Sequence, residues 1–182
     1  MNRASWGITI IMIVSGLVIA GCSQGFEPKE PASPSTPPPS TGTGIGNLAP
    51  DFKLKSLEGQ AFSLGSVQGK PVLLNFWATW CGPCRFEMPL LQDIYEEYSG
   101  KGVVLVTVDI GESASQVDKF MRSEGLSLPV LLDTKSEVAA KYNIVAIPTT
   151  FFIDKDGIIR DKKIGAFTDK TQIEKSLNKI SP

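Results

Sequence analysis

The sequence contains no histidine, and this absence excludes several classes of function at once. Without an imidazole the chain cannot build a Ser–His or Cys–His catalytic pair, a histidine metal site or a CxxCH haem-attachment motif. Cysteine is also scarce, with three residues, so a framework of structural disulfides is not available. The formal net charge of −1 gives no field that would favour nucleic acid or an acidic substrate.

The sequence also lacks an apolar run of the roughly 20 residues that a membrane-spanning helix needs. Residues 6–20 form a shorter apolar run that follows Arg3 and leads into Ile19-Ala-Gly-Cys22. This pattern indicates an export signal over residues 1–21. Its end resembles a bacterial lipobox, which implies cleavage before Cys22, lipid attachment there and a membrane tether outside the cytoplasm. An uncleaved signal anchor is the alternative.

Residues 22–46 have a composition that cannot form a hydrophobic core. Serine, threonine and glycine dominate together with six prolines, Pro28, Pro31, Pro34, Pro37, Pro38 and Pro39. Proline-rich segments are extended and semi-rigid, at about 3 Å per residue. We therefore predict a spacer that holds the following domain, residues 47–182, away from the membrane; a proline-rich recognition motif is the alternative.

Residues 47–182 alternate between strand and helix patterns, and 42% of the whole chain is hydrophobic, enough for an ordinary core. A hairpin is expected first, turning at Glu58-Gly59, because two short alternating runs flank that pair. The later patterns predict strands over 71–76, 103–109, 129–133, 150–154 and 158–165, and helices from 84 and over 113–124, 136–142 and 169–180. This order predicts an α/β fold.

Cys81 and Cys84 lie where the strand at residues 71–76 gives way to the helix that follows. Residues three apart on a first helical turn share a face, so their sulfur atoms can reach disulfide distance. The amide groups and positive dipole end of a helix stabilise a thiolate, the reactive species. We predict that Cys81 is the exposed nucleophile and Cys84 the shielded resolving thiol. Pro83 suits the first helical turn.

The alternative for such a cysteine pair is half of a zinc site. Zinc takes four cysteine or histidine ligands, and this chain has one further cysteine and no histidine. An intramolecular zinc site therefore cannot be completed, and we expect no metal and no cofactor besides the redox-active pair.

The segment Trp80-Cys81-Gly82-Pro83-Cys84 after an apolar strand resembles the thioredoxin active site. With the preceding Asn75-Phe-Trp-Ala-Thr and the following Glu87-Met-Pro-Leu-Leu, it is similar to the membrane-anchored TlpA/ResA-like branch of that superfamily. The resemblance extends over residues 48–180. It implies a thioredoxin-like mixed sheet flanked by helices, with the hairpin as an N-terminal extension.

The resemblance also implies a substrate groove beside the cysteines. A proline before a strand lies opposite the CxxC motif in the cis form throughout the superfamily, and Pro148 matches it; a plain turn proline is the alternative. The groove would be formed by Ile147, Pro148 and the residues around the cysteines, Trp80, Gly82 and Pro83. Alternation along the strand predicts that Trp77 points into the core.

Resolution of a mixed disulfide needs a proton acceptor for Cys84. Thioredoxin has a buried aspartate where this chain has Asn75, which cannot act as a base. Glu87, one turn after Cys84, matches the acidic residue associated with the site in ResA-like proteins, and burial would raise its pKa into a useful range. A solvated glutamate paired with a cation is the alternative. Arg85 is expected either to lower the pKa of Cys81 or to be a plain surface charge.

The predicted function is an extracytoplasmic, lipid-anchored thiol–disulfide oxidoreductase that reduces protein disulfides. The resemblance implies apocytochrome c as a substrate in cytochrome c maturation, and a CcdA/DsbD-type membrane protein as electron donor. A peroxiredoxin-like thiol peroxidase is the first alternative, because Ala49-Pro-Asp-Phe52 opens both kinds of domain. A non-enzymatic tethered binding module is the second.

Overall fold

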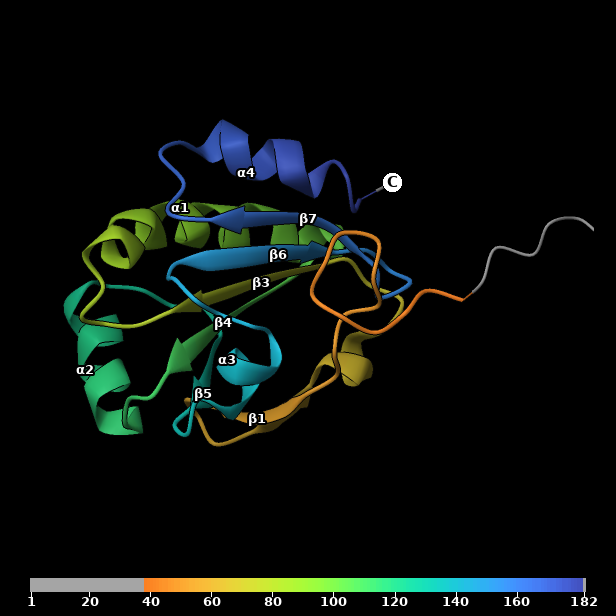
Figure 1. The fold of residues 1–182 in the computed structure, drawn as a ribbon. Helices are drawn as coiled ribbons and strands as arrows, with labels where there is room; N and C mark the ends of the chain where they lie inside the picture. Colours follow the sequence, from red (N-terminus) through yellow and green to blue (C-terminus); the bar gives the residue numbers. More distant parts are fainter. Residues whose placement is uncertain (1–37, 182) are drawn as a thin grey trace, which may run out of the picture. The chain divides into compact units, whose positions relative to one another are not determined.

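The strands of residues 38–181, the part of the chain that the computed structural model describes, form one mixed sheet (Figure 1). The strand order is β2-β1-β5-β4-β3-β6-β7. The pairs β3–β4 and β4–β5 are parallel, and all other neighbouring pairs are antiparallel. The bounds are β1 (Lys53–Ser56), β2 (Ala61–Ser63), β3 (Val72–Trp77), β4 (Val104–Ile110), β5 (Val130–Asp133), β6 (Thr149–Ile153) and β7 (Ile159–Ile164). The predicted mixed sheet and N-terminal hairpin are confirmed.

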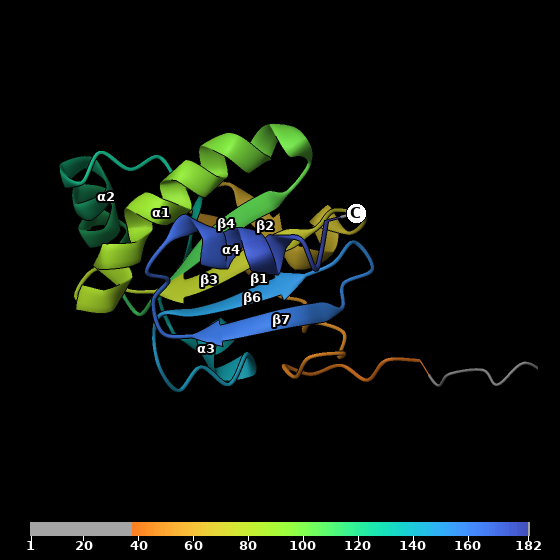
Figure 2. The same cartoon turned by 90° about the horizontal axis from the view of Figure 1, so that it is seen from above.

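The helices cover both faces of this sheet (Figures 1 and 2). They are α1 (Gly82–Tyr98), α2 (Ala114–Ser123), α3 (Glu137–Lys141) and α4 (Lys170–Leu177), with the 3-10 turns η1 (Leu64–Val67) and η2 (Ser99–Lys101). Apolar side chains of α1, α2 and α4 share one core cluster. The other face is covered by α3 and by the segment that precedes β3. Each face thus has its own core, as expected for a sheet between helical layers.

Strand β3 places the site because it lies in the middle of the sheet and is buried along its whole length. Such a continuous apolar run is typical of a strand covered on both faces. The carboxyl end of β3 leads directly into α1, and the carboxyl end of the parallel strand β4 lies beside it. In open α/β sheets this edge is where functional groups collect.

Residues 40–46, which the sequence places in the spacer, are attached to the folded part. The amides of Gly42 and Gly46 donate to the carbonyls of Leu48 and Ile159, at 3.0 and 2.8 Å. The Leu48 amide donates to the carbonyl of Ser40 at 3.0 Å. These backbone bonds, which composition does not reveal, bring the ordered fold closer to the proline run than predicted. The predicted signal, Cys22 and the rest of the spacer lie outside the described residues.

Candidate active site

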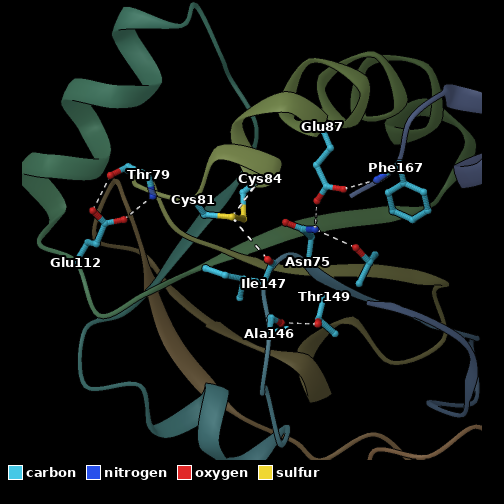
Figure 3. Close-up of a disulfide and its surroundings, with 11 residues drawn as sticks. Asn75, Thr79, Cys81, Cys84, Glu87, Glu112, Ala146, Ile147, Thr149 and Phe167 are labelled. Atoms are coloured by element: carbon cyan, nitrogen blue, oxygen red, sulfur yellow. Dashed lines mark hydrogen bonds between the residues drawn. A yellow bond between two sulfur atoms is a disulfide. The ribbon is translucent and has the colours of Figure 1, made fainter. Parts of the chain in front are cut away.

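Cys81 and Cys84 form a disulfide at the beginning of α1 (Figure 3). Cys81 is the N-cap residue, and its sulfur accepts the Cys84 amide at 3.2 Å. Pro83 lies in the first turn, where its missing N–H leaves no hydrogen bond unmade. After reduction the same amide and the positive end of the helix would face a Cys81 thiolate and stabilise it. The predicted placement of the pair is confirmed.

The exposure of the two sulfurs differs from the prediction. Cys84 is fully buried as expected, but Cys81 is only 5% exposed in the disulfide form. The Ile147 carbonyl oxygen lies 3.7 Å from its sulfur, and both cysteines belong to the core cluster that contains Trp77. The prediction of an exposed Cys81 is therefore wrong for this state, because the disulfide and the Ile147 segment cover the atom that sequence position alone leaves open.

The Ile147–Pro148 peptide bond is cis, as the resemblance implies. Pro148 is buried and Ile147 half-buried, so this segment forms a wall next to Cys81 (Figure 3). Trp80 on the other side of the motif is 72% exposed, whereas Trp77 is fully buried, as alternation along the strand predicts. Gly82 and Pro83 are exposed. Of the predicted groove residues, Ile147 is thus the one whose carbonyl lies next to the Cys81 sulfur.

Glu87 lies on α1, three residues after Cys84, and is fully buried (Figure 3). One carboxylate oxygen accepts the Asn75 side-chain amide at 2.8 Å, and the other accepts the Phe167 backbone amide at 2.8 Å. Asn75 also donates to the Thr150 hydroxyl at 2.9 Å. Burial raises the pKa of Glu87 to about 7, although these two donors and the Lys163 charge act to lower it. The alternative of a solvated glutamate is overturned.

Arg85 is exposed on the same helix. Its guanidinium pairs with Glu124 at 3.4 Å and lies 5.7 Å from the centre of the Phe120 ring. Both partners belong to the region around the end of α2. The structure therefore joins Arg85 to α2, which agrees with the interpretation of a surface charge.

The AhpC/TSA family matches residues 45–162. The chain belongs to this family. It is 37% identical to the thiol-disulfide oxidoreductase ResA of Bacillus cereus over 181 residues, which span 100% of this chain and 98% of that protein. The crystal structure of StoA from Bacillus subtilis is similar with a TM-score of 0.62 and 32% identity, covering 70% of this chain and 96% of that one.

The exposed lipoprotein thioredoxin Etrx1 of Streptococcus pneumoniae is also similar, with a TM-score of 0.60, 34% identity and coverage of 71% and 98%. With the ResA relative and the StoA fold, this likeness confirms the predicted resemblance to ResA-like proteins. This member of the AhpC/TSA family is a thioredoxin-like thiol–disulfide oxidoreductase. The disulfide at α1 is the group in the described residues that fits this activity.

Three polar residues close to the disulfide were not identified from the sequence. Glu112 accepts both the backbone amide and the hydroxyl of Thr79, and Asp109 is fully buried at the end of β4. The available signal was position: Asp109 lies near the carboxyl end of a buried strand parallel to the one that leads to Cys81, and Glu112 follows that strand. Asp109 sits inside that apolar run and gives no pattern of its own.

Two further findings concern the part of the chain that is described. Among residues 38–181, no group of three or more His, Cys, Asp or Glu side chains could hold a metal ion. Helices of sufficient length and hydropathy to span a bilayer are also not found in this range.

Proposed function

We propose that this member of the AhpC/TSA family is a membrane-tethered, extracytoplasmic enzyme that reduces disulfides of other proteins. The observation that carries this proposal is the Cys81–Cys84 disulfide at the positive end of α1, next to cis-Pro148. A thiolate in this position is stabilised by the helix N-terminus, and the backbone of Ile147 lies beside it, where it could pair with the chain of a protein substrate.

The reaction proceeds in two exchange steps. The Cys81 thiolate attacks one sulfur of the substrate disulfide, forms a mixed disulfide and releases the other substrate sulfur as a thiolate, which takes up a proton. Cys84 then loses its proton and attacks the Cys81 sulfur, which releases the second substrate thiol and forms the disulfide seen in the structure. Two electrons pass to the substrate in each cycle.

Glu87 is our candidate for the group that takes the Cys84 proton. Its pKa of about 7 lets it accept and return a proton at neutral pH, and Asn75, which cannot act as a base, instead orients it through a hydrogen bond. Glu87→Gln should slow release from the mixed disulfide about tenfold or more and remove a pH dependence near 7. Unchanged thiol pKa values and an unchanged reduction rate in this variant would refute the role.

The proposed substrates are disulfide-bearing extracytoplasmic proteins, among them the haem-site cysteines of apocytochrome c. A CcdA/DsbD-type membrane protein would supply the electrons. Resemblance to the TlpA/ResA-like branch supports both proposals. A peptide with an oxidised haem-attachment motif should be reduced faster than a scrambled disulfide peptide of equal length. Equal rates would remove the preference for apocytochrome c and leave the reductase activity intact.

The direction of electron flow is tested by the reduction potential of Cys81–Cys84, measured on the full chain in glutathione and dithiothreitol buffers. The Gly-Pro pair between the cysteines is that of thioredoxin, so we expect roughly −270 mV or lower. A value near roughly −120 mV would identify a protein that inserts disulfides and would reverse the proposal.

Attachment through Cys22 is supported by its lipobox-like context and by the likeness to a lipoprotein thioredoxin. Cys22→Ser should move the protein from the detergent phase to the aqueous phase on detergent partition and abolish the mass increase of acylation. A variant that still partitions with detergent would favour the uncleaved signal anchor.

A further inference from the structure

Behind the disulfide, two carboxyl groups lie close to the turn that leads from β3 to α1. Asp109 is on β4, in register with Trp77 of the parallel strand β3, and Glu112 follows the end of β4. Gly111 between them has a φ of +78°, a conformation that a side chain would strain. This turn brings Glu112 to Thr79, two residues before Cys81 (Figure 3).

Glu112 holds Thr79 by both of its polar groups. The backbone amide donates to one carboxylate oxygen at 2.6 Å, and the hydroxyl donates to the other at 2.6 Å. Glu112 is only 7% exposed, so water competes little for these bonds. Hydrogen bonds to a carboxylate are stronger than those between neutral groups. Thr79 therefore has a fixed place, and so does the Ala78–Cys81 turn, which is closed by the Cys81 amide.

Asp109, in register with Trp77 of β3, has no hydrogen-bond donors comparable to those that Thr79 offers to Glu112. It is fully buried, and neither of its carboxylate oxygens has a hydrogen-bond partner within residues 38–181. Burial raises its pKa to about 8; the neighbouring Glu112 side chain and the Asp133 charge act in the same direction, and the Glu112 backbone amide acts against them. A protonated Asp109 has a donor to offer to Glu112, whereas an ionised Asp109 faces like charge.

The surroundings of Asp109 contain acids and apolar groups. Glu112 approaches from the turn after β4 and Asp133 from the end of β5. The strand β3 contributes Trp77, whose ring contacts Phe120 of α2 at a centroid distance of 5.4 Å. The acid of α1, Glu87, is engaged by donors of its own. The charged side chains that act on the Asp109 pKa are those of the acids Glu112 and Asp133.

We propose that Asp109 and Glu112 form a carboxylic acid–carboxylate pair that positions the Cys81 turn. Asp109 keeps its proton and donates it in a hydrogen bond to Glu112, and Glu112 remains an ionised acceptor for both bonds from Thr79. Loss of the Asp109 proton places two negative charges together, weakens the hold on Thr79 and slows exchange at Cys81. Both acids are positioning residues, because they act on the sulfur through Thr79. The proposal rests on thiol–disulfide exchange itself and not on its direction or substrate.

The first experiment follows the Thr79 amide by NMR in the full-length, oxidised chain, in which the disulfide keeps Cys81 and Cys84 from titrating. In the wild type its chemical shift should change with an inflection near pH 8. The Asp109→Asn variant, whose amide still donates to Glu112, should lack this inflection. Glu87→Gln is the matched control, since it removes a buried acid on α1 and should retain the inflection. A flat wild-type titration between pH 6 and 9.5, or one unchanged in Asp109→Asn, overturns the proposal.

The second experiment measures the exchange rate of the reduced full-length chain with a small aromatic disulfide, divided by the thiolate fraction at each pH. The wild-type rate should fall several-fold above pH 8, and the Asp109→Asn rate should not fall. Glu112→Gln, which cannot accept both Thr79 bonds, should be about fivefold slower at every pH. A wild-type rate that does not fall above pH 8 contradicts the proposal. If Glu112→Gln does not fold, the wild type and Asp109→Asn decide the outcome. A wrong substrate or direction in the proposed function would leave both experiments unchanged.

Discussion

Glu87 and Asp109 are both fully buried acids on the α1 side of the sheet, but their surroundings differ. Each oxygen of Glu87 accepts a hydrogen bond from an amide, one from Asn75 and one from Phe167. The oxygens of Asp109 accept none within residues 38–181, and its ionisable neighbours are acids. Burial raises both pKa values, to about 7 and about 8. At Glu87 two hydrogen-bond donors and the Lys163 charge oppose the increase, whereas at Asp109 the acids Glu112 and Asp133 add to it and the Glu112 backbone amide opposes it.

This difference separates two uses of a buried acid. Donors on both oxygens let Glu87 exist as a carboxylate near neutral pH, which a proton acceptor must do. An acid that has a second carboxylate beside it keeps its proton instead and acts as a donor. Burial alone would not distinguish the two. Their hydrogen-bond partners do, and each of the following changes tests that distinction.

The largest effects on activity should come from replacing the two cysteines, because both acids act on exchange at their sulfur atoms. Cys81→Ser should abolish exchange, because no thiolate remains to attack the substrate. Cys84→Ser should permit the first step and accumulate the mixed disulfide, since nothing resolves it. Mass spectrometry under non-reducing conditions measures both outcomes. If the mixed disulfide accumulates in Cys81→Ser instead, the roles of the two cysteines are reversed.

The dependence of stability on pH should be the next largest effect. Both acids have a higher pKa in the folded chain than their ordinary 4.5 and 3.8, so the folded state binds more protons between these values. Stability is then greatest below about pH 4 for these two groups and falls as the pH rises through about 7 and 8. Each pKa unit corresponds to about 1.4 kcal/mol, so the loss should reach several kcal/mol.

Urea unfolding of the oxidised chain at intervals from pH 5 to 9 measures this loss. Glu87→Gln should flatten the curve up to about pH 7, and Asp109→Asn should flatten it up to about pH 8. The exposed acid Asp118, which pairs with Arg122, provides the matched control Asp118→Asn. Slopes that are identical in all variants would mean that neither acid holds its proton in the folded state.

A smaller effect is expected when Glu87 loses one of its hydrogen-bond donors, which makes its surroundings more like those of Asp109. Asn75→Ala removes the donor to one Glu87 oxygen, and that donor lowers the pKa. The pKa of Glu87 should therefore rise by about one unit, a typical effect of one hydrogen bond to a buried charge. Carbon-13 NMR of the carboxyl group follows this titration. The Thr150→Val variant, which removes the other partner of Asn75, should change it less. A lower pKa in Asn75→Ala would contradict the role of Asn75.

The smallest effect should come from the surface pair Arg85–Glu124, whose side chains are 54% and 43% exposed. Arg85→Ala should change the free energy of unfolding by less than about 1 kcal/mol, since solvent screens such pairs. Urea unfolding measures this change. The control is Lys155→Ala, which removes another exposed ion pair, Lys155–Asp156. A larger loss would show that contact of Arg85 with Phe120 contributes to packing of α1 on α2.

Most of the order of strands and helices followed from the sequence, because its apolar residues recur at clear strand and helix spacings. The run from Val72 to Phe76 and the spacing after Cys84 give a buried strand followed by an amphipathic helix, and the structure has both. The positions of Trp77 and Trp80 follow from the same alternation. The cis bond at Pro148 came from family resemblance, since most proline bonds are trans.

The sequence by itself determined which chemistry is available. Without histidine, and with two cysteines at a strand-to-helix junction, the sequence favoured a thiol pair at a helix N-terminus as the reactive group. Only the tertiary structure decided how that pair is covered and tuned. The Ile147 carbonyl over Cys81, the amides on Glu87 and the carboxylate beside Asp109 come from segments distant in the chain or across a turn. Burial and hydrogen bonding set a pKa, and both depend on neighbours in space that a local pattern does not specify.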